Sequence, residues 1–279
     1  MSSPLISTAE LRDLIAGRAP VSVLDVRYRT GDGPSGPGEY SLGHVPGAVY
    51  VDLDTELAAP PGARGRHPLP DPQAFQEAMR RAGVSEGRQV VVYDDWTGLA
   101  AGRAWWLLRF HGHVDVRVLD GGWTAWVQDA GEVERGLELN SQPGDFTARP
   151  HQLPVVEADR VLDVPVLVDA RAPERYRGET EPIDPVAGHI PGAVNVPTST
   201  NLGADGRFRG PEQLRALYEA AGVPTDGGQE VAVYCGSGVT AIHDILALEI
   251  LGVPATLYPG SWSEWVTDPE RPVATGSEE

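Results

Sequence analysis

Short apolar runs alternate with longer apolar segments along the whole chain. The runs Val21–Leu24, Val90–Tyr93 and Val116–Leu119 are too short for helices, and they lack the polar alternation of strands that face water on one side. These runs predict buried strands. The segments Leu99–His111 and Thr240–Leu251 have helical length, and each is followed by a glycine suited to a left-handed helix stop.

The alternation of strand and helix predicts an α/β fold in which a mainly parallel sheet is flanked by helices. A large part of this pattern occurs twice. Gly43–Val51 recurs as Gly188–Val196, with seven of nine positions identical. Other pairs follow in the same order: Val23–Arg27 with Leu167–Arg171, Val90–Tyr93 with Val231–Tyr234, and Gly121–Trp126 with Gly260–Trp265.

A duplicated fold agrees with the length of 279 residues, which is sufficient for two domains. We expect a first domain over residues 1–135, a linker over 136–159 that prolines and glycine interrupt, and a second domain over 160–279. Ligands of such sheets bind at the carboxyl ends of the strands.

The composition excludes several classes of partner. The formal net charge of −18 argues against nucleic acid and against an anionic membrane, since both require clustered positive charge. No stretch approaches the roughly 20 apolar residues of a membrane span. The first ten residues have neither a basic nor an apolar signal region, so we expect a cytoplasmic protein.

The single cysteine, Cys235, excludes an intramolecular disulfide and any multi-cysteine metal site. No nucleotide-binding motif is present, and we expect no cofactor and no metal. Cys235 follows a predicted strand and opens the loop Cys235–Thr240, which leads into a helix. Glycines let the loop amides converge, and the helix N-terminus adds positive potential, so this environment favours a thiolate. The alternative is a buried packing cysteine.

Three kinds of reaction use such a loop. A cysteine phosphatase needs an arginine six positions after the cysteine, where this chain has Ala241. A papain-like hydrolase needs a facing histidine base, but His243 lies in the helix that follows the loop. Sulfur transfer needs neither, because the thiolate takes a sulfur atom, holds it as a persulfide and passes it on.

Together, the paired Gly-His-Val/Ile-Pro-Gly-Ala-Val motifs, the loop Cys-Gly-Ser-Gly-Val-Thr-Ala at 235–241 and the Gly-Ser-Trp-x-x-Trp motif at 260–265 resemble the two-domain rhodanese family. The resemblance extends from about Leu5 to Trp265. The loop is most similar to that of 3-mercaptopyruvate sulfurtransferases, whereas thiosulfate sulfurtransferases typically carry basic residues directly after the cysteine. The resemblance implies a catalytically silent first domain, and Asp94 stands at the position that matches Cys235.

The same resemblance implies roles for individual residues. Cys235 would be the persulfide nucleophile, and Ser237 would relay a proton or bind the donor by a hydrogen bond. Asp54 would complete a triad with these two, and His67 would be a histidine of the cleft. The rest of the loop would bind substrate; its residues are Gly236, Gly238, Val239 and Thr240.

Arg175 matches an arginine that binds the donor carboxylate, a task for which a guanidinium is well shaped. The mercaptopyruvate enzymes of the family carry a second arginine nine residues later, where this chain has Asp184. Arg177 is a candidate for reaching the same anion.

Structural interpretations exist for several of these residues. Asp54 is a candidate helix N-cap before Thr55, and His67 a candidate surface-loop residue. His44 and His189 occur in identical turns of both halves, which favours a structural hydrogen bond over catalysis.

The expected function is a sulfurtransferase that takes sulfane sulfur from 3-mercaptopyruvate, releases pyruvate, and passes the sulfur to cyanide or a thiol, such as that of a thioredoxin-like protein. The neutral residues Gly236 and Ser237 offer no charge to a thiosulfate dianion. Three alternatives remain open: a thiosulfate:cyanide sulfurtransferase, a persulfide carrier that does not turn over, and a scaffold in which Cys235 is inert.

Overall fold

The computed structural model describes residues 3–28, 36–137 and 142–276. Part of the predicted linker, residues 138–141, lies outside the described residues. Contacts divide the chain into two compact units. The first comprises residues 1–59, 70–152 and 205–207, and the second comprises residues 60–69, 153–204 and 208–279. The short segment 60–69 thus belongs with the second unit although the chain on both sides of it belongs to the first.

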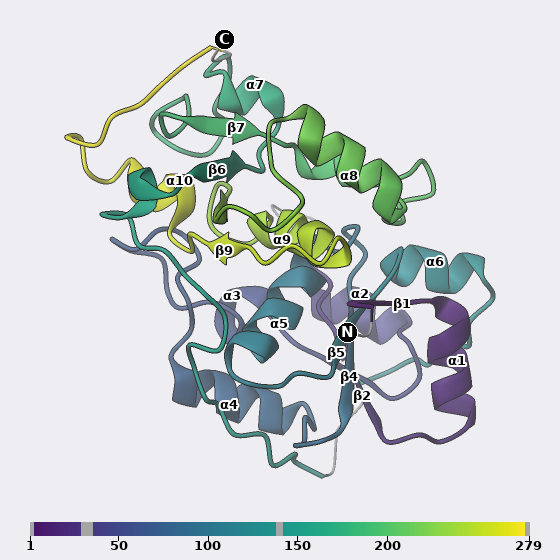
Figure 1. Ribbon diagram of the computed structural model, residues 1–279. Helices are drawn as coiled ribbons and strands as arrows, with labels where there is room; N and C mark the ends of the chain where they lie inside the picture. The colour runs from purple at the N-terminus through teal and green to yellow at the C-terminus, as the bar shows by residue number, and fades with distance from the viewer. Residues whose placement is uncertain (1–2, 29–35, 138–141, 277–279) are drawn as a thin grey trace. The chain divides into compact units, whose positions relative to one another are not determined.

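The first unit contains a parallel sheet with strand order β1-β5-β4-β2-β3. In Figure 1, α4 and α5 lie on one side of β2, β4 and β5, while α1 and α6 lie on the other. Its elements are β1 (Leu5–Ile6), α1 (Thr8–Ala16), β2 (Val21–Asp25), α2 (Gly36–Leu42), β3 (Ala48–Tyr50), α3 (Leu53–Glu56), α4 (Pro72–Arg81), β4 (Gln89–Tyr93), α5 (Leu99–Phe110), β5 (Val116–Leu119) and α6 (Gly122–Gln128).

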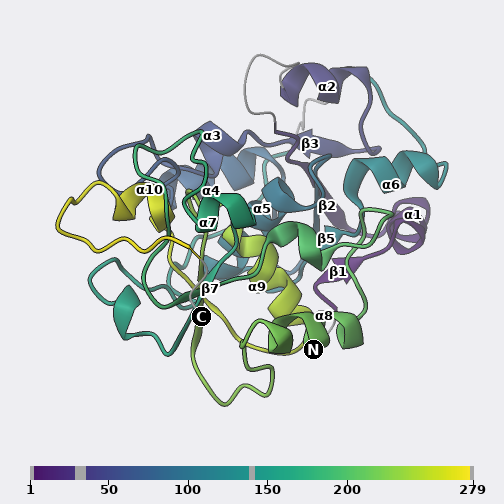
Figure 2. The same ribbon diagram turned by 90° about the horizontal axis from the view of Figure 1, so that it is seen from above.

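The second unit repeats this sheet in the order β7-β6-β8-β9, again with parallel pairing. A single parallel bridge from Val155 to Leu257 stands where β1 stands in the first unit. Helices α8 and α9 are in contact, as Figures 1 and 2 show. The elements are η1 (Val161–Asp163), β6 (Val166–Asp169), α7 (Pro173–Tyr176), β7 (Ala193–Asn195), η2 (Thr198–Asn201), α8 (Pro211–Ala220), β8 (Val231–Tyr234), α9 (Ala241–Ile250), β9 (Thr256–Leu257) and α10 (Ser261–Trp265).

The predicted fold class is confirmed. The runs predicted as buried strands became β2, β4 and β5, and the two long apolar segments became α5 and α9. Gly112 and Gly252 follow these helices with φ of +94° and +75°, the left-handed conformation expected of a helix stop. Every residue of β8 is buried. The strand therefore fixes the position of its last residue, Tyr234, and of the loop that follows.

The repeated turn motifs have the same structural role in both units. His44 Nδ1 contacts the carbonyl oxygen of Tyr40 at 2.9 Å, and His189 Nδ1 contacts that of Tyr176 at 2.7 Å. Each histidine ring also stacks on its tyrosine. These bonds support the structural interpretation of both histidines.

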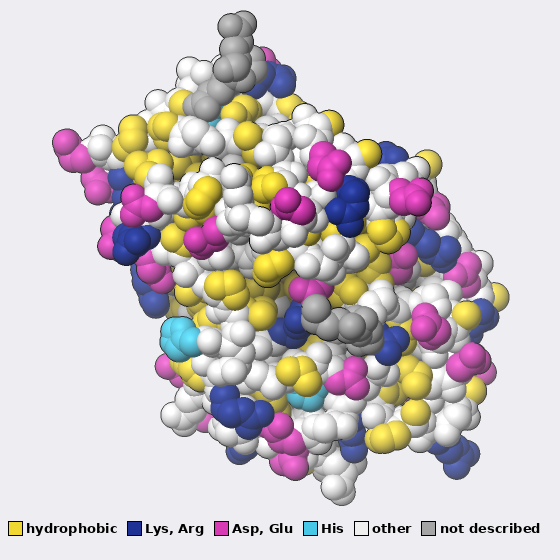
Figure 3. Space-filling model, viewed as in Figure 1, with side chains coloured by type: hydrophobic (Ala, Val, Ile, Leu, Met, Phe, Trp, Pro, Cys, Tyr) yellow, Lys and Arg dark blue, Asp and Glu magenta, His cyan; other side chains and the backbone are white. Residues whose placement is uncertain are grey.

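Acidic and basic side chains are intermixed on the face drawn in Figure 3. Among the described residues, no helix is long and apolar enough to cross a membrane.

Candidate functional site

The loop that carries Cys235 is held by the first residues of α10. Cys235 donates its backbone N–H to the Ser261 hydroxyl at 3.1 Å, and its carbonyl oxygen accepts from Trp262 N–H at 3.0 Å. The carbonyl of Gly236 accepts from Ser263 N–H at 2.9 Å. Cys235 is only 1% exposed. The cysteine therefore sits in a loop whose backbone is fixed on both sides of it.

The sulfur atom of Cys235 accepts a hydrogen bond from the backbone N–H of Gly238 at 3.2 Å. Gly238 has φ of +75°, and a side chain there would overlap the carbonyl oxygen of Pro259. Glycine is thus required for the amide to reach the sulfur. Val239 is buried, and Thr240 precedes the first turn of α9 without capping it through its side chain. Their predicted role in substrate binding remains a prediction.

Asp94 occupies the equivalent loop of the first unit. One carboxylate oxygen accepts from the N–H groups of Trp96 and Gly98, and the other from those of Ala100 and Ala101, at 2.8–2.9 Å. The side chain is fully buried, and burial raises its pKa while the four amides act in the opposite direction. In the first unit, the loop after the strand therefore directs four amide donors to the tip of the Asp94 side chain.

The segment 60–69 contributes two side chains beside the cysteine loop. His67 Nδ1 lies 2.7 Å from the hydroxyl oxygen of Ser237. Arg66 donates its backbone N–H to the Ser263 hydroxyl at 3.1 Å. Gly65 has φ of +94°, and a methyl group there would lie 2.7 Å from the carbonyl oxygen of Gly260. Close backbone approach at Gly65 thus brings Arg66 and His67 to the loop.

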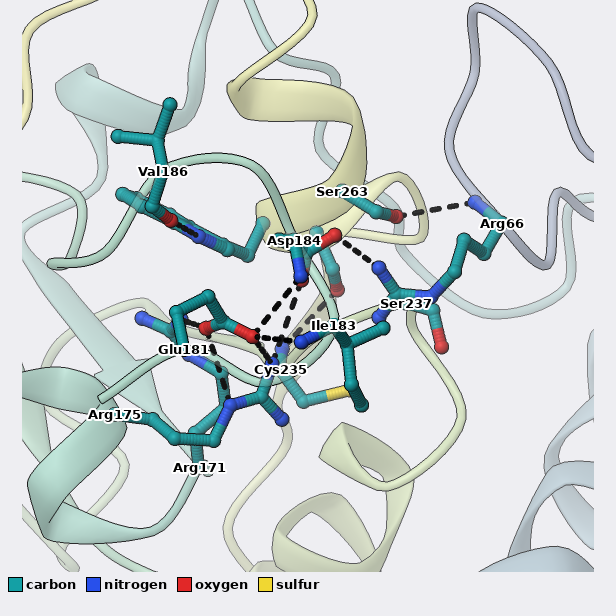
Figure 4. Close-up of polar contacts among 12 residues, drawn as sticks. Arg66, Arg171, Arg175, Glu181, Ile183, Asp184, Val186, Cys235, Ser237 and Ser263 are labelled. Carbon is teal, nitrogen blue, oxygen red and sulfur yellow. Dashed lines mark hydrogen bonds and ion pairs between the residues drawn. The ribbon is translucent and has the colours of Figure 1, made fainter. Parts of the chain in front are cut away.

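Two arginines and two carboxylates form a cluster over Gly236. Asp184 pairs with Arg66 Nη1 and, at 3.4 Å, with Arg175 Nη2, so its carboxylate lies between the two guanidinium groups (Figure 4). Glu181 accepts from Arg175 at 2.6 and 3.1 Å. A methyl carbon on Gly236 would lie 2.9 Å from Arg66 Nη2 and 3.6 Å from Arg175 Nη2. Both cations therefore adjoin the residue next to Cys235.

The two carboxylates differ in their electrostatic balance. Burial opposes ionisation of Glu181, but hydrogen bonds from Arg175 and from the amides of Asp184 and Ile183 outweigh it and hold the Glu181 pKa below its usual value. For Asp184 burial is the dominant effect and raises its pKa, although the charge and hydrogen bond of Arg66 oppose it.

Two further predicted site residues are Asp54 and Arg177. Asp54 lies inside α3 in the first unit, so its part in a triad remains a prediction. Asp52, whose side chain accepts from Thr55 N–H at 2.9 Å, is the N-cap of this helix, and the alternative that Asp54 caps it is wrong. Arg177 is paired with the exposed Glu179 at 2.8 Å, outside the cluster over Gly236.

Sequence reasoning missed Glu181, the partner of Arg175, and Arg66. For Arg66 a weak signal existed, namely its position directly before His67, the histidine implied by the resemblance. Among the described residues, no group of three or more His, Cys, Asp or Glu side chains could hold a metal ion. The site therefore combines one sulfur, loop amides, two cations and a histidine–serine hydrogen bond.

Comparisons with known proteins give a consistent result. The family model for the rhodanese-like domain matches residues 7–129 and 155–268. The "Putative thiosulfate sulfurtransferase SseB" of Mycobacterium tuberculosis is 46% identical, over 98% of this chain and 97% of that protein. The "Probable 3-mercaptopyruvate sulfurtransferase" of Pseudomonas aeruginosa is also 46% identical, over 99% and 100%. The crystal structure of SseA from Escherichia coli, a 3-mercaptopyruvate sulfurtransferase, has a TM-score of 0.82 and 33% identity, over 94% of this chain and all of that one.

Proposed function

This chain belongs to the family of proteins built from rhodanese-like domains, and on that premise we propose that it is a sulfurtransferase whose sulfur travels as a persulfide on Cys235. The preferred donor is 3-mercaptopyruvate, and the acceptor is cyanide or a thiol. We place the reaction in the cytoplasm, where thiols remain reduced.

The observation that carries this proposal is the hydrogen bond from Gly238 N–H to the Cys235 sulfur, taken together with the loop around Asp94. An aspartate extends two atoms beyond Cβ, as a cysteine persulfide does. The oxygens of Asp94 accept four amide hydrogen bonds at that place. The corresponding loop after β8 is therefore suited to hold the terminal sulfur anion of a persulfide.

The chemistry balances without a cofactor. The Cys235 thiolate attacks the sulfur of 3-mercaptopyruvate, an S–S bond forms, and the C–S bond breaks with its electron pair going to carbon. The resulting enolate takes up the proton that the donor thiol releases, which gives pyruvate and an ionised persulfide. A cyanide ion or thiolate then attacks the outer sulfur and regenerates the Cys235 thiolate.

The surrounding side chains suit these steps. The hydrogen-bonded pair His67 and Ser237 can carry the proton to the enolate. Arg175 presents two guanidinium nitrogens to Gly236 and can bind the donor carboxylate. Asp54 is proposed as a third member of the triad with Cys235 and Ser237.

Two measurements test the proposal. Incubation with 3-mercaptopyruvate, followed by mass spectrometry, should show the mass gain of one sulfur atom on Cys235. A multiple-turnover assay with cyanide should show steady formation of thiocyanate. Loading without turnover would indicate a persulfide carrier instead, and no loading from either 3-mercaptopyruvate or thiosulfate would reject sulfur transfer altogether. Comparison of kcat/KM for the two donors decides the substrate, and a preference for thiosulfate would overturn the choice of mercaptopyruvate.

A further inference from the structure

The charges over the cysteine loop cancel. Arg66 and Arg175 supply two positive charges, and Asp184 and Glu181 supply two negative ones. Glu181 also lies 3.4 Å from Arg171, whose guanidinium is already paired with its own buried carboxylate. The site therefore offers arginine donors to an anion without an excess of positive charge.

Asp184 holds Arg66 in place. Arg66 is 29% exposed, and a long side chain at such a position ordinarily samples many rotamers. Here its backbone N–H is bound by Ser263, and its Nη1 is bound by Asp184, whose side chain is only 4% exposed. Its other terminal nitrogen, Nη2, then faces Gly236. The ion pair thus aims one end of the guanidinium at the cysteine loop.

We propose that Arg66 and Asp184 together determine which donor the site accepts. Arg66 binds the donor carboxylate together with Arg175. Asp184 is a positioning residue that keeps the two guanidinium groups side by side, and its charge makes the site suited to a monoanion rather than a dianion. This inference rests on the proposed function and adds a donor-selecting pair to it.

The preference for a monoanion follows from the position of the Asp184 charge. A donor bound by both arginines lies within a few ångströms of the Asp184 carboxylate. At that distance the Asp184 carboxylate repels the second negative charge of a dianion such as thiosulfate. The single carboxylate of 3-mercaptopyruvate is matched by the two guanidinium groups. Removal of the Asp184 charge should therefore favour the dianion selectively.

The test compares kcat/KM for thiosulfate and for 3-mercaptopyruvate in the wild-type chain and in the variant Asp184→Asn. This substitution keeps the size of the side chain and removes its charge. In Asp184→Asn, the ratio of kcat/KM for thiosulfate to kcat/KM for 3-mercaptopyruvate should rise on the order of tenfold. Glu179→Gln is the matched control, because it removes one carboxylate charge from an exposed side chain of the same segment. An unchanged ratio in Asp184→Asn, or an equal rise in Glu179→Gln, would overturn the inference.

Arg66→Ala provides an independent measurement if Asp184→Asn does not fold. It should raise the KM for 3-mercaptopyruvate about tenfold with little change in kcat, and Arg66→Lys should restore part of the loss because the charge returns without the planar fork. An unchanged KM in Arg66→Ala contradicts the inference. A wild-type chain that forms no persulfide rejects the proposed function itself, whereas a chain that loads sulfur but fails these tests rejects the donor-selecting pair alone.

Discussion

The guanidinium of Arg66 is paired with the carboxylate of Asp184, although 118 positions separate the two residues. The resemblance to the family implied a second arginine nine residues after Arg175, where this chain has Asp184. In the structure, a cation from segment 60–69 adjoins Gly236 together with Arg175. The departure at position 184 therefore goes together with an arginine supplied from a distant part of the chain.

Replacement of Cys235 by serine should abolish sulfur transfer with little loss of stability. The exchange alters one small atom and leaves no large cavity. The bond from the Cys235 backbone N–H to Ser261 does not involve the side chain. Thiocyanate formation measures transfer, and thermal unfolding measures stability. Substantial residual transfer would contradict the role of this residue as the nucleophile.

Arg175→Ala should raise the KM of the donor about tenfold or more, with a smaller effect on kcat, because a carboxylate bound alike in ground and transition states contributes uniform binding. Arg160→Ala is a suitable control, since it removes an exposed arginine of the same unit that is paired with the neighbouring Asp163. A defect confined to kcat would show that Arg175 does more than anchor the donor.

His67→Ala and Ser237→Ala should each lower kcat by about a hundredfold if the pair transfers the proton to the enolate. Because the two side chains are hydrogen-bonded at 2.7 Å, the double variant should be no slower than the slower single one. Steady-state kinetics with 3-mercaptopyruvate across a pH series measures both effects. Independent, multiplicative losses would show that the two residues do not act as one unit.

Gly238→Ala should destabilise the protein and impair sulfur loading. A left-handed conformation costs an L-residue roughly 1–2 kcal/mol, and here a side chain also meets the Pro259 carbonyl. Gly252 has the same φ of +75°, but a methyl group added there meets no neighbouring side chain or backbone within 4 Å. Gly252→Ala therefore measures the cost of the left-handed backbone alone. Chemical denaturation should show a larger loss for Gly238→Ala, and only that variant should load sulfur poorly. Equal effects of the two variants would show that the contact with the Pro259 carbonyl oxygen does not matter.

The parts of the site that sequence analysis could predict are those that depend on local pattern. Residues 231–250 contain the buried strand before Cys235, the glycines of its loop and the helix that follows. The repeat supplied a second copy for comparison. Local sequence also explains Arg177, whose partner Glu179 is two positions away.

Arg66 could not be predicted in this way. Its placement depends on contacts of segment 60–69 with Asp184 and Ser263, which lie 118 and 197 positions further along the chain. Neither periodicity nor motif spacing reports such contacts. The interpretation of Asp54 as a helix cap failed for a different reason. The helix begins at Leu53, two residues earlier than a cap at Asp54 implies, and helix ends are the least certain part of any sequence-based assignment.

Segment 60–69 makes the duplicated halves unequal in what they can do alone. A fragment cut anywhere between the repeats would keep Cys235 and its loop but would lose Arg66 and His67, which the preceding half encodes. Truncation or shuffling of the second half would thus yield a thiol without its neighbours. The second unit is therefore complete only with a segment that lies within the first half of the sequence.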